Sequence, residues 1–288
     1  MAIHEQNYVR YDGPIREEGA GGIWTIGWTG FRVYTGFTRT KLIILLLWLA
    51  SPIGATILVL FEYIFRGQMG QFGGEPSAPD GGYIVGFLQL QAYSLAILLM
   101  AAGCGVVAED LRYRTFQLYF AKPVSRLQYA LGKFTSIFLL GSLVTLVPSV
   151  IVGSLRAALF IQTDFFKDVL IQVGTGIAMS AFLTLVMCLI VMGLSSLTAR
   201  TGYVVLSWIA LLLVPAMVSG ILALAMPESN INQLVSITGN FGVLSDWLLL
   251  KEFEFEGPKW VAPIVLTVLA ALGAGATARR IKRLEGVA

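Results

Sequence analysis

The segment Glu109–Phe134, EDLRYRTFQLYFAKPVSRLQYALGKF, lies between two long hydrophobic stretches and carries five Lys and Arg residues. Basic residues in the short loops of a membrane protein favour the cytoplasmic side. Asp110 predicts the start of a helix running to about Phe120, because acidic side chains stabilise a helix at its positive end. Pro123 is expected to stop this helix, and Ser125 to cap the next one, which runs into the following hydrophobic stretch. Residues 109–133 therefore predict a cytoplasmic loop built around a short amphipathic helix.

The composition of the 288 residues is typical of a membrane protein: 56% are hydrophobic, 13% are charged, and the mean hydropathy is +0.77. A soluble domain carries about a quarter charged residues. Alternation typical of a membrane barrel is absent, so helices are the expected spanning structure. We predict an all-α membrane protein whose six spans, each long enough to cross a bilayer, are Leu42–Phe65, Ile84–Ala108, Phe134–Leu155, Val169–Thr198, Tyr203–Met226 and Trp260–Ala278.

The distribution of basic residues predicts the orientation of these spans. Fifteen of the 20 Lys and Arg residues fall on the side of the two chain ends, and the other five fall on the opposite side. This bias places both ends in the cytoplasm. The predicted organisation is a cytoplasmic N-terminal segment (1–41) without a cleavable signal peptide, a six-helix membrane domain (42–278) with an outer segment (227–259), and a cytoplasmic tail (279–288).

Two segments outside the spans have helical patterns. In residues 22–41, helical spacing aligns Trp24, Trp28 and Phe31 along one side, with Arg32 and Arg39 on a flank. An aromatic and basic helix of this kind lies in the membrane interface, and its four glycines weaken it as an isolated helix.

In the outer segment, we predict short interfacial or re-entrant helices that cap the outer end of a pathway. Leu244, Trp247 and Leu248 have the spacing of one amphipathic helix, Ile231, Leu234 and Val235 form a second apolar cluster, and Gly239 and Asn240 predict a turn.

The sequence offers few residues that could carry chemistry. The single histidine, His4, lies near the N-terminus, and no GxxxxGK[ST] phosphate-binding loop is present, so we expect no enzymatic activity and no cofactor on this chain. The only charge within the predicted spans is Glu62, which we interpret as an interfacial ion pair with Arg66. Gln89 and Gln91 lie on different faces of the second span; either could line a cavity or hydrogen-bond a neighbouring helix.

The loop residues resemble a known family, the permease subunits of type-2 (ABC-2) ATP-binding-cassette transporters. The resemblance is carried by Glu109-Asp110, by Thr115-Phe116-Gln117-Leu118, by the run Ala121-Lys122-Pro123-Val124-Ser125-Arg126 and by Leu131-Gly132-Lys133-Phe134, and it extends to the order of the elements along the chain. Members of the family often have glycine before the threonine, where this chain has Arg114.

The resemblance implies a subunit that forms the translocation pathway with a second permease, either a copy or a paralogue. It also implies separate ATPase subunits that bind ATP and Mg²⁺ and dock on a coupling helix, flanked by the 22–41 helix as a connecting helix. The residues it assigns to docking are Glu109, Asp110, Arg112, Arg114, Thr115, Phe116, Tyr119, Lys122, Pro123 and Arg126, and those it assigns to the pathway are Gln89, Gln91, Ser94, Ser207 and Pro215. With so little fixed charge in the spans, we expect export of an apolar or amphipathic substrate across a cell membrane, of bacterial or archaeal kind.

Two other interpretations remain open on the sequence alone. The same scaffold could transmit ATPase motion to an envelope enzyme or a surface machine, with the acidic outer stretch Glu228–Glu256 as the docking surface for a periplasmic or extracellular partner. It could also be a channel or scaffold that needs no ATP. The modest net charge of +3 does not indicate a nucleic-acid partner.

Overall fold

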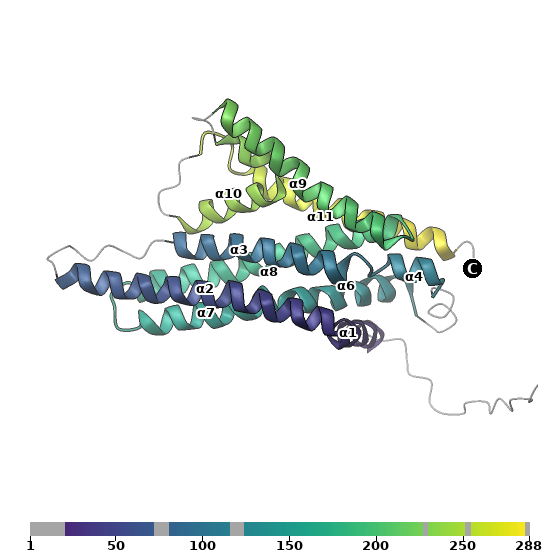
Figure 1. The fold of residues 1–288 in the computed structure, drawn as a ribbon, viewed down its shortest axis with the longest axis horizontal. Helices are drawn as coiled ribbons and strands as arrows, with labels where there is room; N and C mark the ends of the chain where they lie inside the picture. Colours follow the sequence, from purple (N-terminus) through teal and green to yellow (C-terminus); the bar gives the residue numbers. More distant parts are fainter. Residues whose placement is uncertain (1–20, 72–80, 116–123, 227–229, 251–254, 286–288) are drawn as a thin grey trace, which may run out of the picture.

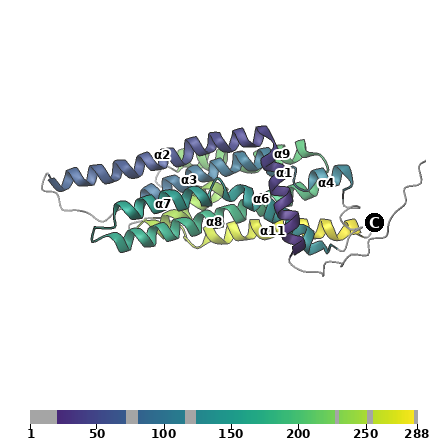
Figure 2. The ribbon, with the colours of Figure 1, turned by 90° about the horizontal axis from the view of Figure 1, so that it is seen from below.

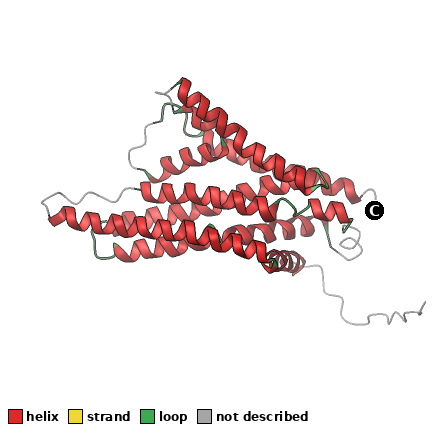
Figure 3. Cartoon of the chain, in the orientation of Figure 1, coloured by secondary structure: helices red, strands yellow, loops and turns green. Residues whose placement is uncertain are grey.

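The structure, a computed structural model, describes residues 21–71, 81–115, 124–226, 230–250 and 255–285. Within these ranges every regular element is a helix, as Figure 3 shows by colour. The predicted all-α class is therefore confirmed.

Six helical segments are long and apolar enough to cross a membrane, which confirms the predicted number of spans. The first is the single helix α2, and the second is α3 followed by the π-helix η1 and the short helix α4. The third is built from α6 and α7, and the last three are single helices. Their bounds are Thr38–Gln71 (α2), Gly82–Leu98 (α3), Leu99–Gly103 (η1), Ala108–Tyr113 (α4), Arg126–Ser142 (α6), Leu146–Leu159 (α7), Phe166–Leu197 (α8), Thr201–Ala225 (α9) and Val261–Glu285 (α11).

The helices α2, α3, α6, α7 and α8 run along a common long axis, whereas α9 and α11 diverge from them toward one end (Figure 1). Helix α1, Gly21–Gly36, lies across the opposite end of the bundle, where α4 and the C-terminal end of α11 also lie (Figure 2). Figure 2 shows α1 running across the ends of the other helices rather than along them. This arrangement is the one expected for a helix in the membrane interface.

The core of the bundle lies where α8 packs against α3, α6 and α11. Leu95, Ile137, Met187 and Val191 contribute side chains there that are fully buried. Helices α8 and α11 approach each other closely at Gly193 and Gly273, since a Cβ built on Gly193 would lie 2.5 Å from the Cα of Gly273. Small residues at such crossings allow backbones to pack closely, which is how many membrane helices associate.

The third span is broken between α6 and α7 by Leu143–Thr145. Pro148 lies just after the break, and because proline has no N–H it cannot donate to the carbonyl of Val144 one turn earlier. Side chains of other helices donate hydrogen bonds to two backbone carbonyls at this break. The indole of Trp48 donates to the Leu143 carbonyl at 2.8 Å, and the Gln91 amide donates to the Thr145 carbonyl at 2.9 Å.

Glu62 forms a buried ion pair with Arg156, which joins α2 to α7. The closest nitrogen and oxygen atoms are 3.2 Å apart and both side chains are only 1% exposed. The expectation that Glu62 is the only charge within the spans was wrong, because α7 continues to Leu159 and includes the buried Arg156. Mutual neutralisation allows both charges to remain inside the bundle. The side chain of the expected partner, Arg66, lies outside the described residues.

Two short helices lie between α9 and α11: the 3₁₀ helix η2, Ile231–Val235, and α10, Ile237–Leu249. Their existence agrees with the predicted outer segment, but two details of that prediction were wrong. The turn lies at Ser236, whose hydroxyl accepts from the Gly239 N–H, so Gly239 and Asn240 belong to the first turn of α10. The predicted apolar face is also divided: Leu244 is buried, whereas Trp247 and Leu248 are 43% and 50% exposed.

Replacing Gly193 with Ala should destabilise the crossing of α8 and α11. The added methyl would force the two backbones apart, and overpacking of this kind costs about 1–3 kcal/mol. Thermal unfolding of the purified protein in lipid nanodiscs measures the effect.

Gly174→Ala is the matched control, because it lies on the same helix and a Cβ there meets nothing within 4 Å. That variant should gain up to about 1 kcal/mol from helix propensity. Equal melting temperatures for the two variants would contradict the proposed role of Gly193 in the crossing.

Candidate functional site

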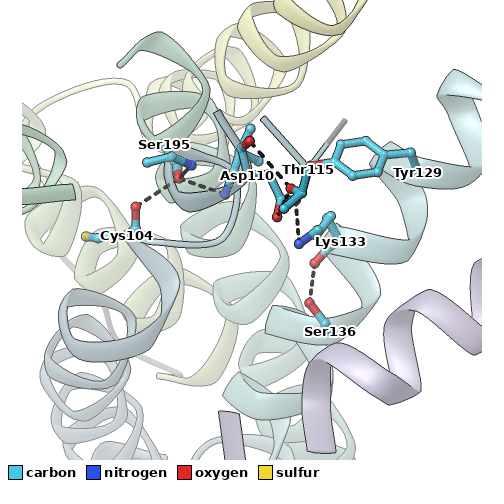
Figure 4. A network of polar contacts seen from close by, with 9 residues as sticks. Cys104, Asp110, Thr115, Tyr129, Lys133, Ser136 and Ser195 are labelled. Atoms are coloured by element: carbon cyan, nitrogen blue, oxygen red, sulfur yellow. Dashed lines mark hydrogen bonds and ion pairs between the residues drawn. The ribbon is translucent and has the colours of Figure 1, made fainter. Parts of the chain in front are cut away.

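The start of α4 is held by a side chain from another span. Ser195 of α8 accepts hydrogen bonds at 3.0 Å from the backbone N–H groups of both Val107 and Ala108 and donates at 2.8 Å to the Cys104 carbonyl. The first N–H groups of a helix have no partner within it, and here they lie where water is scarce. Ser195 therefore satisfies them and fixes the entry of α4 to α8 (Figure 4).

The Asp110 carboxylate is the second point that holds α4. Its oxygens accept hydrogen bonds from the Tyr129 hydroxyl at 2.5 Å and the Thr115 hydroxyl at 2.9 Å, and pair with the Lys133 ammonium at 2.6 Å. The Asp110 and Lys133 side chains are only 12% and 14% exposed. Tyr129 and Lys133 are one turn apart on α6 and lie on the same side of that helix. This network joins α4 to the first two turns of α6 (Figure 4).

Helix α4 is shorter than predicted. It ends at Tyr113, and the next residue, Arg114, has a φ of 55° in the left-handed region. The expectation of a continuous helix from Asp110 to about Phe120 was therefore wrong, because a left-handed residue stops an α-helix. The family's frequent glycine at this position has a physical reason here, since glycine adopts positive φ without steric cost.

The predicted docking residues separate into two groups in the structure. Asp110 and Thr115 are turned into the network that holds α4, whereas Glu109 is exposed. The exposed cations Arg112, Arg114 and Arg126 lie beside the large apolar side chains of Tyr113 and Leu127, both 67% exposed. We call these five residues the basic–aromatic patch. Phe116, Tyr119, Lys122 and Pro123 lie outside the described residues.

The beginning of α6 agrees with the sequence. The Ser125 hydroxyl accepts from the Gln128 N–H at 3.2 Å, and the Gln128 side chain accepts from the Ser125 N–H at 2.9 Å. This reciprocal pair is a capping box, in which each side chain satisfies the other's backbone. The predicted capping role of Ser125 is confirmed.

Helix α1 packs directly on α6 through small residues. A Cβ built on Gly132 would lie 2.7 Å from the Ile26 Cβ, and one on Gly27 would lie 2.9 Å from Thr135. The glycines predicted to weaken the 22–41 segment as an isolated helix thus permit its close contact with α6. The same end of the molecule therefore brings α1, α4 and α6 together.

The other face of α1 is aromatic, as its spacing predicted. Trp24 stacks on Trp28 with ring centroids 5.7 Å apart, Phe31 stacks on Trp28, and the Arg32 guanidinium lies 5.3 Å from the Trp28 ring centre. The placement of Arg39 on this helix was wrong. The helix ends at Gly36 and α2 begins at Thr38, so Arg39 belongs to the first span.

The residues assigned to the pathway lie in different surroundings. Gln91 and Ser94 are buried, and Gln91 bonds to Ser149 and Ser180 as well as to Thr145. Gln89, on the other face of α3, is exposed and borders a pocket against α10.

On α9, Ser207 is exposed and Pro215 is half-buried. Of the five pathway residues, Gln91 and Ser94 thus lie between helices of this chain, and Gln89, Ser207 and Pro215 reach its surface.

Sequence reasoning assigned no functional role to Ser195 or Tyr129. Ser195 gives no signal along the chain, because its partners are about 90 residues earlier. The spacing of Tyr129 and Lys133 does give a signal in the sequence. Two polar side chains one turn apart, shortly after a capping serine, can bind a single carboxylate such as that of Asp110.

Ser195→Ala should destabilise the protein by about 1–3 kcal/mol, because it leaves two buried N–H groups without an acceptor. Ser196→Ala is the matched control, since the neighbouring Ser196 is equally buried but donates only within its own helix, to the Gly193 carbonyl at 2.7 Å. Thermal unfolding compares the variants, and hydrogen exchange at Val107 and Ala108 should accelerate in Ser195→Ala only. Unchanged exchange at these two amides would contradict the capping role.

Arg114→Gly should keep or raise the melting temperature, because a non-glycine residue with left-handed backbone costs roughly 1–2 kcal/mol, against about 0.5–1 kcal/mol for the extra freedom of glycine when unfolded. Arg114→Val should lower it, since β-branched residues avoid positive φ. Arg112→Val, within the helix, controls for the loss of charge. A melting temperature for Arg114→Val equal to that of Arg112→Val would show that the backbone at position 114 is not strained.

Comparison with known proteins gives one informative result. No curated protein matches the chain. A family model described as "ABC-2 family transporter protein" matches residues 74–276. This range covers the second to fifth spans, the α4–α6 region and the outer segment, and most of α11. With well over half of its length matched, and with six spans arranged as described above, the chain belongs to the ABC-2 family of transporter membrane proteins.

Proposed function

We propose that the chain is the permease subunit of an exporter that is driven by separate ATPase subunits. Membership of the ABC-2 family implies association with ABC ATPase subunits, and permeases of this family normally have no ATPase activity of their own. ATP and Mg²⁺ would then bind in the partner. A second permease, identical or paralogous, would complete the pathway across the cell membrane.

The observation that carries this proposal is the construction of the end where α1, α4 and α6 meet. The basic–aromatic patch is exposed there, while the backbone that presents it is held rigidly by Ser195 and by the Asp110 network. Arginine and tyrosine are enriched where proteins bind one another, because they combine apolar contact with directed hydrogen bonds. A surface of this kind is suited to receiving a partner's force.

The connections of α4 support transmission of that force into the membrane. A push on α4 reaches α8 through Ser195 and α6 through Asp110, and α6 carries α1 with it through the Gly132 contact. Charged hydrogen bonds are among the stronger individual contacts in proteins. Helices α4, α6 and α1 would therefore move together when the ATPase closes.

The substrate class that fits best is amphipathic. The buried charges of Glu62 and Arg156 neutralise each other, so this pair presents no net charge to an apolar group. Polar side chains instead reach the surface near the outer ends of α3 and α9. An amphipathic molecule meets both environments as it leaves the membrane.

Affinity purification from the native membrane tests the docking site. The wild-type chain should bring down a nucleotide-binding ATPase, and Arg112→Glu should lose most of it, because the exposed Arg112 would attract an acidic partner surface and a glutamate there would repel it. Lys167→Glu is the matched control, since it makes the same charge change on an exposed residue at the opposite end of the bundle. Mass spectrometry quantifies the ATPase relative to the permease.

Each outcome of this purification decides a separate point. An ATPase retained by Lys167→Glu and lost by Arg112→Glu supports the proposal. Retention by both variants would place the docking site elsewhere. Absence of an ATPase from the intact wild-type complex would overturn the proposed function.

A further inference from the structure

A polar pocket of about 260 Å³ lies between α3, α9 and the η2–α10 segment. Its walls include Gln89 and Tyr93 of α3, Ser219 of α9, Gln233 of η2, and Thr238 and Asp246 of α10. This composition contrasts with that of another pocket, between α2, α3, α7 and α8, whose walls are largely apolar.

The pocket is lined in part by residues of two helices that are long and apolar enough to span a membrane, near the end opposite α4. Gln89 is seven residues after the first residue of α3, a distance of about 10 Å along a helix. Ser219 is similarly placed, six residues before the last residue of α9. Polar groups at this depth must bind one another, water or a ligand, so a pocket lined with them favours a polar occupant.

Internal hydrogen bonds fix the walls of the pocket. The Ser219 hydroxyl donates to the Asn232 carbonyl at 2.8 Å, and the Asn240 amide donates to the Leu234 carbonyl at 2.7 Å, which together hold η2 between α9 and α10. Gln89 also lies close to α10, since its amide nitrogen would be in van der Waals contact, at 3.5 Å, with a Cβ built on Gly242. These contacts connect α3, α9, η2 and α10 around the pocket.

Asp246 supplies the one formal charge among the residues that line the pocket. Within the described part of the chain, its carboxylate has no hydrogen-bond or ion-pair partner, and partial burial raises its pKa. An ionised carboxylate held in this way favours a positively charged ligand. Tyr93, 58% exposed, adds an aromatic ring of the kind that attracts ammonium groups.

We propose that this pocket binds the ammonium head group of an amphipathic amine, with Asp246 as its counter-ion and Tyr93 and Gln89 as neighbouring contacts. The inference rests on the proposed function, because it identifies the pocket as the outer station of the transported substrate. The apolar part of the amine would lie along the exposed apolar side chains of α9, among them Met217 and Ile221, which are 64% and 63% exposed.

Other ligand classes fit the pocket less well. An anion would meet the Asp246 carboxylate with no lysine or arginine among the lining residues to offset it. A divalent metal ion requires several acidic or histidine ligands, and no group of three such residues is found in the described part of the chain.

Binding of 2-phenylethylammonium to the purified permease, without any ATPase, tests the proposal. Isothermal titration calorimetry in nanodiscs compares it with 2-phenylethanol, which has the same shape and no charge. The wild-type chain should bind the amine at least about tenfold more tightly than the alcohol, since a charged hydrogen bond with Asp246 is gained. Asp246→Asn should lose this preference.

Two controls separate a lost site from a damaged fold. Asp164→Asn removes an equal charge from an exposed loop outside the pocket and should bind the amine like the wild type. Asp246→Asn should melt no lower than the wild type, because a carboxyl group with a raised pKa destabilises the folded state wherever it is ionised, and the amide removes that cost.

The outcomes are distinct from those of the purification experiment. Selective loss of amine binding in Asp246→Asn supports the inference. Equal binding of amine and alcohol by the wild type, or amine binding that survives Asp246→Asn, would overturn it. Because no ATPase is present in the calorimetry, a negative result leaves the proposed transporter standing, and failure to recover an ATPase leaves the binding result valid.

Discussion

The fold depends on satisfying backbone hydrogen bonds where helices are interrupted inside an apolar environment. An N–H or carbonyl without a partner costs several kcal/mol in lipid, yet the second and third spans both depart from the regular α-helix. In each case side chains from other helices form hydrogen bonds with the backbone at the interruption. Ser195 accepts from two N–H groups before α4, Gln91 and Trp48 donate to carbonyls between α6 and α7, and Trp208 donates to the Ala96 carbonyl beside the π-helix. The interruptions are thus also the points where the helices are joined.

The two ends of the bundle differ in how their helices are joined by these hydrogen bonds and contacts. At the end with α4, three helices are joined by an ion pair, a shared serine and glycine contacts, so that position and force are shared among them. At the other end, α9 and α11 diverge and the short helices η2 and α10 fill the space between them and α3 (Figure 1). The end with α4, where a partner would bind, is held by many contacts between helices. The polar pocket lies at the opposite end, where a substrate would leave.

Much of the architecture was predictable because it follows from local patterns. Hydropathy identifies the six spans, and the Ser125–Gln128 spacing identifies the start of α6. The errors arose where contacts distant in sequence decide the outcome. Arg156 was placed outside the third span because its buried partner, Glu62, lies 94 positions earlier in the sequence. The end of α4 at Arg114 could not be read from propensity, since arginine is a good helix former and only the surrounding contacts require a positive φ.

The position of the described motif residues at one end of the bundle was predictable, whereas the contacts that they make were not. Residues 109–115 and 124–134 do lie at that end, but Asp110 is used to hold α4 in place. Gln91 likewise proved to be part of a buried network with Ser149 and Ser180. A polar residue on a predicted span signals that a partner exists, and the sequence alone does not say whether that partner is a ligand or another helix.

The buried pair of Glu62 and Arg156 has a consequence for how this protein can vary over evolutionary time. Loss of either member removes the counter-ion of a buried charge, at a cost of about 3–5 kcal/mol, whereas replacement of both by apolar residues of similar volume is often neutral or stabilising. A protein in which only one of the two positions has changed is therefore less stable than either the original or the double variant. Positions 62 and 156 should be inherited as a single trait, retained together or lost together.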